Sequence, residues 1–294
     1  MKLHFHAAFA ITFLLSMSDI AAHATVIVRS IGGDATPASI TPTRDNFRID
    51  LGGGTTAGAN GSFGGLRREI NWDGVAATAS APNSLPANFF NSTSPRGVVF
   101  STPGTGFGVS SAAADNGAGQ PAAATFGNIN ANYTNTFGVF SSERVFTAFG
   151  STITDVNFFL PGTNTVASVS GFGAVFTDVD TAGSTTIQLF DPNNVSLGTF
   201  NVAAGTVASR SLSFLGLFTN AGERIGRARI TSGNAALGAA TVDGGATDLV
   251  VMDDFIYSEP VAVPEPSSLL FGLTGVAAFA ARRRLKRTSS AGAA

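Results

Sequence analysis

Oxygen ligands for a cation are the chemistry that this sequence offers most directly. Asp178 and Asp180 are one residue apart in a predicted loop, and Asp253 and Asp254 are adjacent in a later apolar segment. Calcium is bound in proteins by several carboxylate and carbonyl oxygens. Neighbouring strand residues point to opposite faces, so we expect one of Asp253 and Asp254 to enter any given site. The alternative is that Asp178 and Asp180 cap a turn and that the other pair is solvated.

The residue types that many enzymes use are missing from the central part of the chain. The sequence has no cysteine, its histidines are His4, His6 and His23, and no lysine lies between residues 25 and 258. For that region the composition excludes a Ser-His-Asp triad, a cysteine nucleophile, a zinc site with His or Cys ligands and a P-loop lysine. Disulfides are excluded as well.

Carboxylate pairs remain as candidates for acid–base chemistry. Two carboxyl groups at a suitable separation can hydrolyse a glycosidic bond. The candidate pairs are Glu69 with Asp73 and Glu143 with Asp178. Glu69 and Asp73 would have α-carbons ~13 Å apart on a strand, which neither requires nor excludes a catalytic pair. The alternative is that these carboxylates are solvated or lie in turns, and we expect no catalytic residues.

Contacts to sugars could come from aromatic rings or from arginines. The aromatic candidates for stacking on a sugar ring are Trp72, Tyr133 and Tyr257, although single aromatic residues on strands more often belong to the core. The local basic cluster consists of Arg224, Arg227 and Arg229, which form either a solvated sheet face or a contact for acidic polysaccharide. Residues 25–258 hold 11 Arg against 16 Asp and Glu, a net charge of −5. This balance, without a large basic patch, argues against nucleic acid as a partner.

The N-terminus has the features of a secretion signal. Lys2 precedes an apolar run at residues 7–17, and Ala22-His23-Ala24 follows. A basic start, a short apolar run and small residues before the cut are typical of a signal peptide. The pattern predicts a signal peptide over residues 1–24, cut by signal peptidase, with Ala22 and Ala24 as the small cleavage-site residues.

The C-terminus carries three segments in order. Pro264-Glu265-Pro266 comes first, an apolar stretch at residues 269–281 follows, and residues 282–287 form a basic cluster. The apolar stretch could form a transmembrane helix of ~20 Å, marginal for a lasting span, with the basic cluster on the cytoplasmic side. The arrangement resembles the PEP-CTERM sorting tail, with Pro264, Glu265 and Pro266 as the motif.

This resemblance implies an address and a processing partner. An exosortase of a Gram-negative bacterium would recognise the tail, and the precursor would be anchored transiently in the inner membrane through its C-terminal helix. The protein would then reach the cell surface or the extracellular matrix of a biofilm-forming organism that produces exopolysaccharide. The alternative is a plain C-terminal membrane anchor.

Short strand-like segments at roughly ten-residue spacing predict an all-β fold. Residues 185–190 and 195–202 flank Asp191-Pro192-Asn193-Asn194 and form the clearest hairpin. No useful helical period occurs outside the two ends, so we expect an antiparallel β-sandwich flanked by a signal helix and a C-terminal hydrophobic helix. The predicted parts are a signal peptide (1–24), N-terminal strands and Gly-rich loops of the same sandwich (25–95), the main sandwich (96–258) and the sorting tail (259–294).

Three segments of the predicted sandwich resemble carbohydrate-binding jelly rolls: residues 171–180, 189–198 and 250–257. This resemblance covers residues 96–258 and implies a sandwich of jelly-roll type. It also implies a structural calcium near the terminal strand, with Asp253 or Asp254 as a ligand.

The sequence therefore predicts a secreted, surface-sorted protein without catalytic activity. We expect a component of the extracellular matrix or envelope that contacts polysaccharide and holds a structural calcium. One alternative is a carboxylate-based glycoside hydrolase or lyase. Another is a purely structural or adhesive surface protein without a small-molecule ligand.

Overall fold

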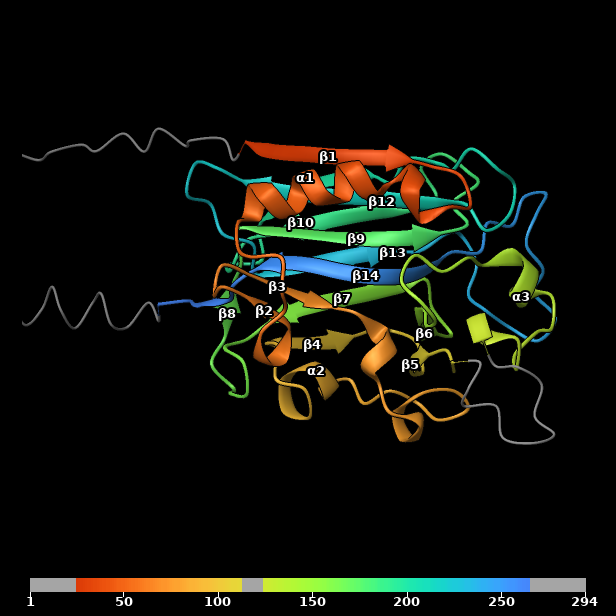
Figure 1. Cartoon of the computed structure of the whole chain (residues 1–294), viewed down its shortest axis with the longest axis horizontal. Coiled ribbons are helices and arrows are strands. Elements are labelled where there is room, and N and C mark those ends of the chain that lie inside the picture. Colours follow the sequence, from red (N-terminus) through yellow and green to blue (C-terminus); the bar gives the residue numbers. More distant parts are fainter. Residues whose placement is uncertain (1–24, 113–123, 265–294) are drawn as a thin grey trace, which may run out of the picture.

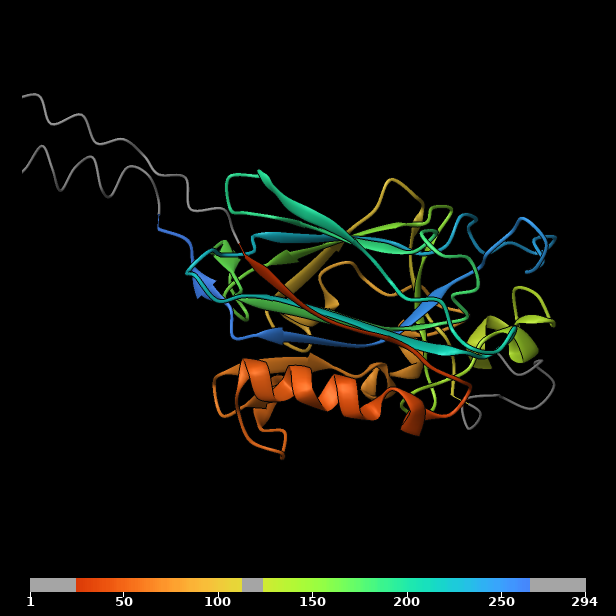
Figure 2. The same ribbon diagram turned by 90° about the horizontal axis from the view of Figure 1, so that it is seen from above.

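The structure is a computed structural model that describes residues 25–112 and 124–264. The predicted signal peptide with Ala22 and Ala24, the residues Glu265 and Pro266, and the predicted C-terminal helix lie outside the described residues. Within the described part of the chain, no helix is long and apolar enough to cross a membrane. Figures 1 and 2 show two stacked sheets, with one long helix lying on the outer face of one of them.

The larger sheet has eight strands, and its pairs are antiparallel. Six strands follow one another in the order β1 (Val26–Gly32), β12 (Leu212–Thr219), β9 (Gly171–Thr177), β14 (Val251–Ser258), β3 (Arg67–Ile70) and β2 (Ser62–Phe63). β6 (Phe146–Phe149) also pairs with β14, and β5 (Gly106–Val109) pairs with β6. Strands from residues 25–95 thus lie in one sheet with strands from the main predicted sandwich.

The smaller sheet has five antiparallel strands. Their order is β11 (Ser196–Asn201), β10 (Thr186–Phe190), β13 (Arg227–Thr231), β7 (Ile153–Phe158) and β4 (Val98–Ser101). A separate pair joins β8 (Ala167–Ser168) to β15 (Val261–Ala262). β10 and β11 form the hairpin that the sequence predicts. The prediction of antiparallel sheets is confirmed. The jelly-roll type stays a prediction.

Helical structure is limited within the described residues. The α-helices are α1 (Thr41–Leu51), α2 (Phe89–Ser92) and α3 (Tyr133–Thr136). Short 3-10 turns occupy Pro37–Ser39, Ala59–Gly61, Trp72–Gly74, Ala77–Ala79 and Ala124–Phe126.

The main core lies between the two sheets and is rich in aromatic side chains. Phe172 and Phe255 of the larger sheet and Phe158 of the smaller one are almost fully buried in it. Their rings contact one another, with centroids 6.1 Å apart for Phe158 and Phe172 and 5.4 Å apart for Phe172 and Phe255. In β10 the buried side chains of Ile187 and Leu189 alternate with half-buried ones, as expected for a sheet with one face in the core.

The helix α1 covers the outer face of the larger sheet, and the expectation of no helix in this region is wrong. Phe47 of α1 is fully buried against Val175, Phe214 and Ile256. The helix was not predicted because the only buried side chain within it is Phe47, too few for a recognisable apolar stripe.

Glycines make room for the contact between α1 and the sheet. Gly173 of β9 and Gly216 of β12 are paired neighbours in the larger sheet. A Cβ atom added to Gly173 would lie 2.8 Å from the Phe47 ring, and one added to Gly216 would lie 2.6 Å from it. The Phe47 ring therefore lies on sheet backbone that only glycine leaves accessible.

Candidate metal centre

Three aspartates from two distant segments converge at one end of the sandwich. Asp178 and Asp180 follow the last residue of β9, and Asp243 lies in the connection between β13 and β14. One carboxylate oxygen of each residue lies within 4.8 Å of those of the other two. We call these three residues the aspartate triad.

The end of β9 fixes the position of Asp178. Thr177, the last residue of β9, pairs with Leu212 on one side and Val251 on the other. Asp178 then turns the chain with a φ of 71°, a left-handed conformation that Asp tolerates better than most residues. Its backbone N–H donates to the carbonyl of Ser211 at 2.8 Å.

A fourth aspartate, Asp248, holds the two segments together. Its carboxylate is fully buried and accepts hydrogen bonds from the backbone N–H groups of Asp180 and Thr181, both at 3.2 Å, and from the Ser184 hydroxyl. Asp243 accepts a hydrogen bond from the N–H of Leu249 at 2.8 Å. Asp248 therefore orders the backbone around the triad, and its charge is already met by donors.

Asp178 carries the strongest indication of a missing partner. The residue is fully buried, and its Oδ1 accepts a hydrogen bond from the N–H of Arg210 at 2.9 Å. Its Oδ2 is buried and has no hydrogen-bond partner among the described residues. A buried carboxylate oxygen without a partner is costly, and a cation would supply one.

Burial and repulsion between carboxylates raise the pKa values of the triad carboxyl groups. Burial raises the pKa of Asp178 to about 8, with further contributions from the charges of Asp243 and Asp180. Burial and the charges of Asp243 and Asp248 raise the pKa of Asp180 to about 6. The pKa of Asp243 is raised too, chiefly by burial. Carboxylates without soft ligands nearby suit a hard cation that binds oxygen.

The structure does not bring Asp253 and Asp254 into this cluster. Asp253 is fully buried and accepts hydrogen bonds from the Phe140 N–H at 2.7 Å and from the Ser141 hydroxyl at 3.1 Å. Asp254 accepts from the same hydroxyl at 2.8 Å. The expected alternation also fails here: at a register shift between Met252 and Phe255, both carboxylates accept from the one Ser141 hydroxyl, and both aspartates are buried. Their role in the structure is to hold residues 140 and 141 on β14, and burial raises the pKa of both.

The aromatic candidates for sugar contacts, Trp72, Tyr133 and Tyr257, are core residues instead, because all three side chains are fully buried. The Trp72 ring stacks on Phe146 with centroids 4.2 Å apart, and its indole N–H donates to the carbonyl of Asp253. The Tyr257 hydroxyl donates to the carbonyl of Arg96, and that of Tyr133 to the carbonyl of Gly238. These rings have no exposed face on which a sugar could stack.

The candidate catalytic carboxylates are engaged in other contacts. Glu69 is bound by the guanidinium groups of Arg48 and Arg67, and Asp73 accepts a hydrogen bond from the N–H of Arg144 at 3.0 Å. Asp178 belongs to the aspartate triad, and Glu143 is not a member of that cluster.

In the basic cluster, Arg227 and Arg229 share the carboxylate of Asp155, and Arg227 also donates to the side-chain oxygen of Asn194. Both donate to the Asp155 carboxylate on the neighbouring strand β7. Arg224 donates instead to the carbonyl and hydroxyl of Ser168. The Asp155 carboxylate therefore compensates one of the two positive charges and holds both guanidinium groups on the sheet.

Sequence spacing could locate only part of the triad. Asp178 and Asp180 are recognisable because they are local neighbours, whereas Asp243 lies 63 positions further along the chain than Asp180. Asp243 precedes two glycines, which marks a turn and does not indicate its spatial partners.

The described residues thus form an antiparallel β-sandwich with a cluster of carboxylates at one end. Residues 262–284 match the PEP-CTERM protein-sorting motif. This motif is the recognition signal for an exosortase, so the chain carries the signal of an exported protein sorted to the envelope of a Gram-negative bacterium. No curated protein matches the chain, and no solved structure matches it.

Proposed function

We propose that this chain is the precursor of an exported β-sandwich protein that an exosortase delivers to the cell surface or extracellular matrix. The folded part acts there without catalysis, binds one calcium ion and contacts polysaccharide. The sorting motif at residues 262–284 is the observation that carries this proposal. The absence of His, Cys and Lys from residues 25–258 supports a role other than catalysis.

Calcium is the ion that we assign to the aspartate triad. Calcium accepts ~6–8 oxygen ligands in flexible geometry, whereas magnesium requires near-octahedral geometry and retains its waters. Three carboxylates within 4.8 Å of one another provide a charged nucleus that backbone carbonyls and waters can complete. The unpartnered Oδ2 of Asp178 is the first ligand atom that we assign.

The sorting proposal is tested by changing the motif in the full chain. We expect wild-type protein from an exosortase-containing host in the surface or matrix fraction, with the tail absent from its intact mass. A triple alanine substitution at Pro264, Glu265 and Pro266 should leave the protein in the inner membrane with the tail attached. Ser267→Ala serves as the neighbouring control and should behave as wild type. Sorting of the triple variant like wild type would refute the proposal.

The calcium proposal is tested by thermal and urea unfolding of the purified protein. An ion that binds only the native state raises the free energy of unfolding by about 2.7 kcal/mol at 100 times its dissociation constant. We expect calcium to stabilise wild type, a chelator to reverse this, and Asp243→Asn to abolish the response. Asp50→Asn, which removes a surface partner of Arg29, is the matched control and should retain it. Equal stability with calcium and with chelator would exclude the site.

A further inference from the structure

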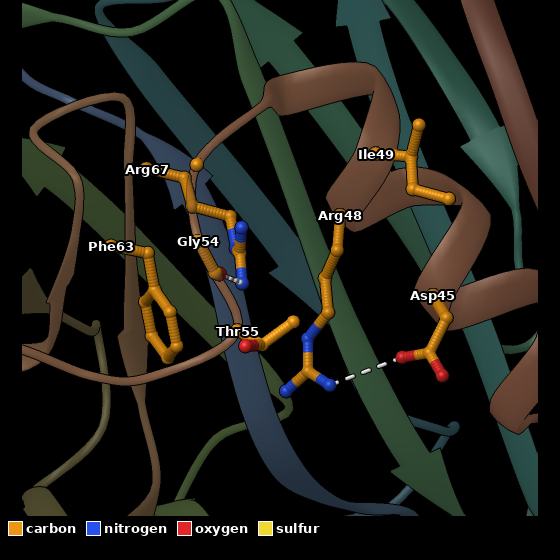
Figure 3. Close-up of a pocket in the computed structure, with 8 residues that line it drawn as sticks. Asp45, Arg48, Ile49, Gly54, Thr55, Phe63 and Arg67 are labelled. Carbon is orange, nitrogen blue, oxygen red and sulfur yellow. Dashed lines mark hydrogen bonds and ion pairs between the residues drawn. The ribbon is translucent and has the colours of Figure 1, made fainter.

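A groove lies between α1 and the Gly-rich loop that follows it. None of the residues that line it belongs to the aspartate triad. It has a volume of about 390 Å³. This volume is within the range of ~300–1,000 Å³ that small-molecule sites usually have. Figure 3 shows its walls, and the lining residues are Asp45, Arg48, Ile49, Gly53, Gly54, Thr55, Phe63 and Arg67.

The loop wall of the groove is held in place by Arg67. Its guanidinium donates to the carbonyl of Gly52 at 2.8 Å and to that of Gly54 at 3.0 Å. Gly53 has a φ of 99°, and a Cβ there would lie 2.3 Å from the carbonyl oxygen of Phe63. The loop therefore has a fixed course that only glycine permits, so the groove is preformed.

Arg48 presents a cationic edge to the groove. Its Nε and Nη2 donate to Glu69 at 2.8 and 2.6 Å, and its Nη1 donates to Asp45 at 3.1 Å. An arginine has five N–H donors, so two of those of Arg48 remain without a partner among the described residues. Figure 3 shows the Arg48 guanidinium reaching toward Thr55, with Asp45 on its other side.

The free donors of Arg48 are the part of the groove that is open to an anionic group. The guanidinium groups of Arg48 and Arg67 are balanced in number by the carboxylates of Asp45 and Glu69. Glu69 is buried and shared by both arginines, whereas the side chain of Arg48 is 25% exposed where it faces the groove. A ligand carboxylate could therefore accept charge-assisted hydrogen bonds from the N–H groups of Arg48 that have no partner among the described residues.

Apolar surface lies beside this cation. The Ile49 side chain is 74% exposed on α1. On the opposite wall, the Phe63 ring packs against the Arg67 guanidinium at 4.2 Å from its centroid. The groove thus combines the free N–H donors of Arg48, the hydroxyl of Thr55 and an apolar edge, which suit a sugar ring bearing a carboxylate.

We propose that this groove binds a uronic acid residue of an acidic polysaccharide. The sugar carboxylate pairs with the free edge of Arg48, the C–H face of the ring lies on Ile49, and the Thr55 hydroxyl bonds a ring hydroxyl. The inference rests on the proposed location of the protein in a polysaccharide matrix, and it names the chemistry of the polysaccharide and the place where it binds.

Binding can be tested with two matched probes. One is a disaccharide of two glucuronic acid residues, and the other is the same disaccharide with its carboxylates reduced to alcohols. We expect titration of the purified protein, followed by NMR, to shift signals of Arg48, Ile49 and Thr55 with the acidic probe. The reduced probe should bind at least 10-fold more weakly.

Two substitutions at exposed positions should change the affinity in opposite directions. Ile49→Glu adds a negative charge and removes the apolar edge, so it should weaken binding of the acidic probe at least 10-fold. Asp45→Asn removes the carboxylate that competes for Arg48, so it should strengthen binding several-fold, which damage to the fold could not do. Val195→Glu, at a position 59% exposed on the β10–β11 hairpin, is the matched control and should have no effect.

Three results would overturn the inference: no binding of the acidic probe, equal binding of both probes, or unchanged affinity in Ile49→Glu. Each would leave sorting and calcium-dependent stability intact if the proposed function is correct. Failure of sorting of the wild-type chain would instead remove the proposed function, whether or not the groove binds the disaccharide.

Discussion

Glu69 illustrates how the surroundings of one carboxylate determine its role. It lies on β3, is 7% exposed and is bound by Arg48 from α1 and by Arg67 from its own strand. Both oxygens accept hydrogen bonds from guanidinium groups. A carboxylate held in this way anchors α1 to the sheet, which is a structural role.

We predict that Glu69→Gln lowers the free energy of unfolding by about 3–5 kcal/mol, because two partly buried guanidinium groups lose their counter-charge. Urea unfolding at pH 7 measures this change. Asp50→Asn, which breaks the more exposed pair with Arg29, should cost no more than about 1 kcal/mol. Similar costs for the two substitutions would contradict the anchoring role of Glu69.

At the residue scale, the sequence indicates the chemistry of the site better than the position of each residue. Asp178 and Asp180 are predictable because their local spacing is visible in the sequence. Asp243 and Asp248 are not, because they reach the site through the pairing of β9 with β14. For Trp72 the sequence leaves a sugar contact and the core open, and the structure places its ring in the core, where a large aromatic side chain gains free energy from burial.

At the scale of elements, the contact between α1 and the larger sheet depends on two glycines. Gly173 and Gly216 are opposite each other on β9 and β12, directly beneath Phe47. Side chains at these positions would push the helix off the sheet, so the pair determines how closely α1 can approach.

We predict that Gly216→Ala lowers the free energy of unfolding by about 1–3 kcal/mol, the usual cost of overpacking. The double variant Gly216→Ala with Phe47→Leu should cost less than the sum of the two single substitutions, because the smaller side chain makes room for the new methyl group. Gly74→Ala, where a Cβ would have no neighbour within 4 Å, is the control. Additive costs in the double variant would show that the two positions are not in contact.

The smaller sheet is crossed by an ion-pair network centred on Asp155 of β7. Arg229 and Arg227 of β13 donate three hydrogen bonds to its carboxylate, at 2.7–2.9 Å. Burial acts to raise the pKa of Asp155, but the hydrogen bonds from Arg229 and Arg227 outweigh it and lower the pKa below its ordinary value. The folded state therefore binds this proton less readily than the unfolded state does.

A lowered pKa makes the contribution of Asp155 to stability depend on pH. It is fully present above the pKa of an unfolded Asp, ~3.9, and is lost as the pH falls through the lower pKa of the folded state. We predict that Asp155→Asn costs about 1–2 kcal/mol at pH 7, discounted because the Arg229 side chain is 40% exposed. Unfolding at a series of pH values should show this cost shrinking below pH ~4. A cost independent of pH would contradict the prediction.

At the scale of the whole molecule, the aspartate triad brings two distant connections together at one end of the sandwich, and the proposed calcium ion would tie them to each other. Removing a bound ion should therefore loosen that end only. We predict that a chelator speeds amide exchange at Asp180, Thr181 and Leu249, whose N–H groups bond to Asp248 and Asp243. Exchange in the β1–β12 pair should not change, and Asp243→Asn should make exchange insensitive to the chelator. Uniform acceleration across the fold would indicate global destabilisation instead.

The overall class of the fold could be predicted, but the arrangement of its strands could not. Alternation and turn residues identify β10 and β11 because their hairpin is local. The neighbours of β14 are β9, β3 and β6, which all lie far away in the sequence, and its side chains are buried on both faces. Such a strand lacks the alternation of apolar and polar residues that would show which face points to the core. Its partner strands are determined by the packing of the whole chain.

The register of the larger sheet gives the molecule two distinct poles. Val26 lies opposite Thr219, and Tyr257 opposite Phe172, so the described chain begins and ends at one pole, as Figure 1 shows. Thr177 and Val251 lie at the other pole, next to the triad. The eight residues of β14 span ~25 Å between them. A molecule tethered through its C-terminal segment would thus hold the aspartate triad at the pole that faces away from the tether.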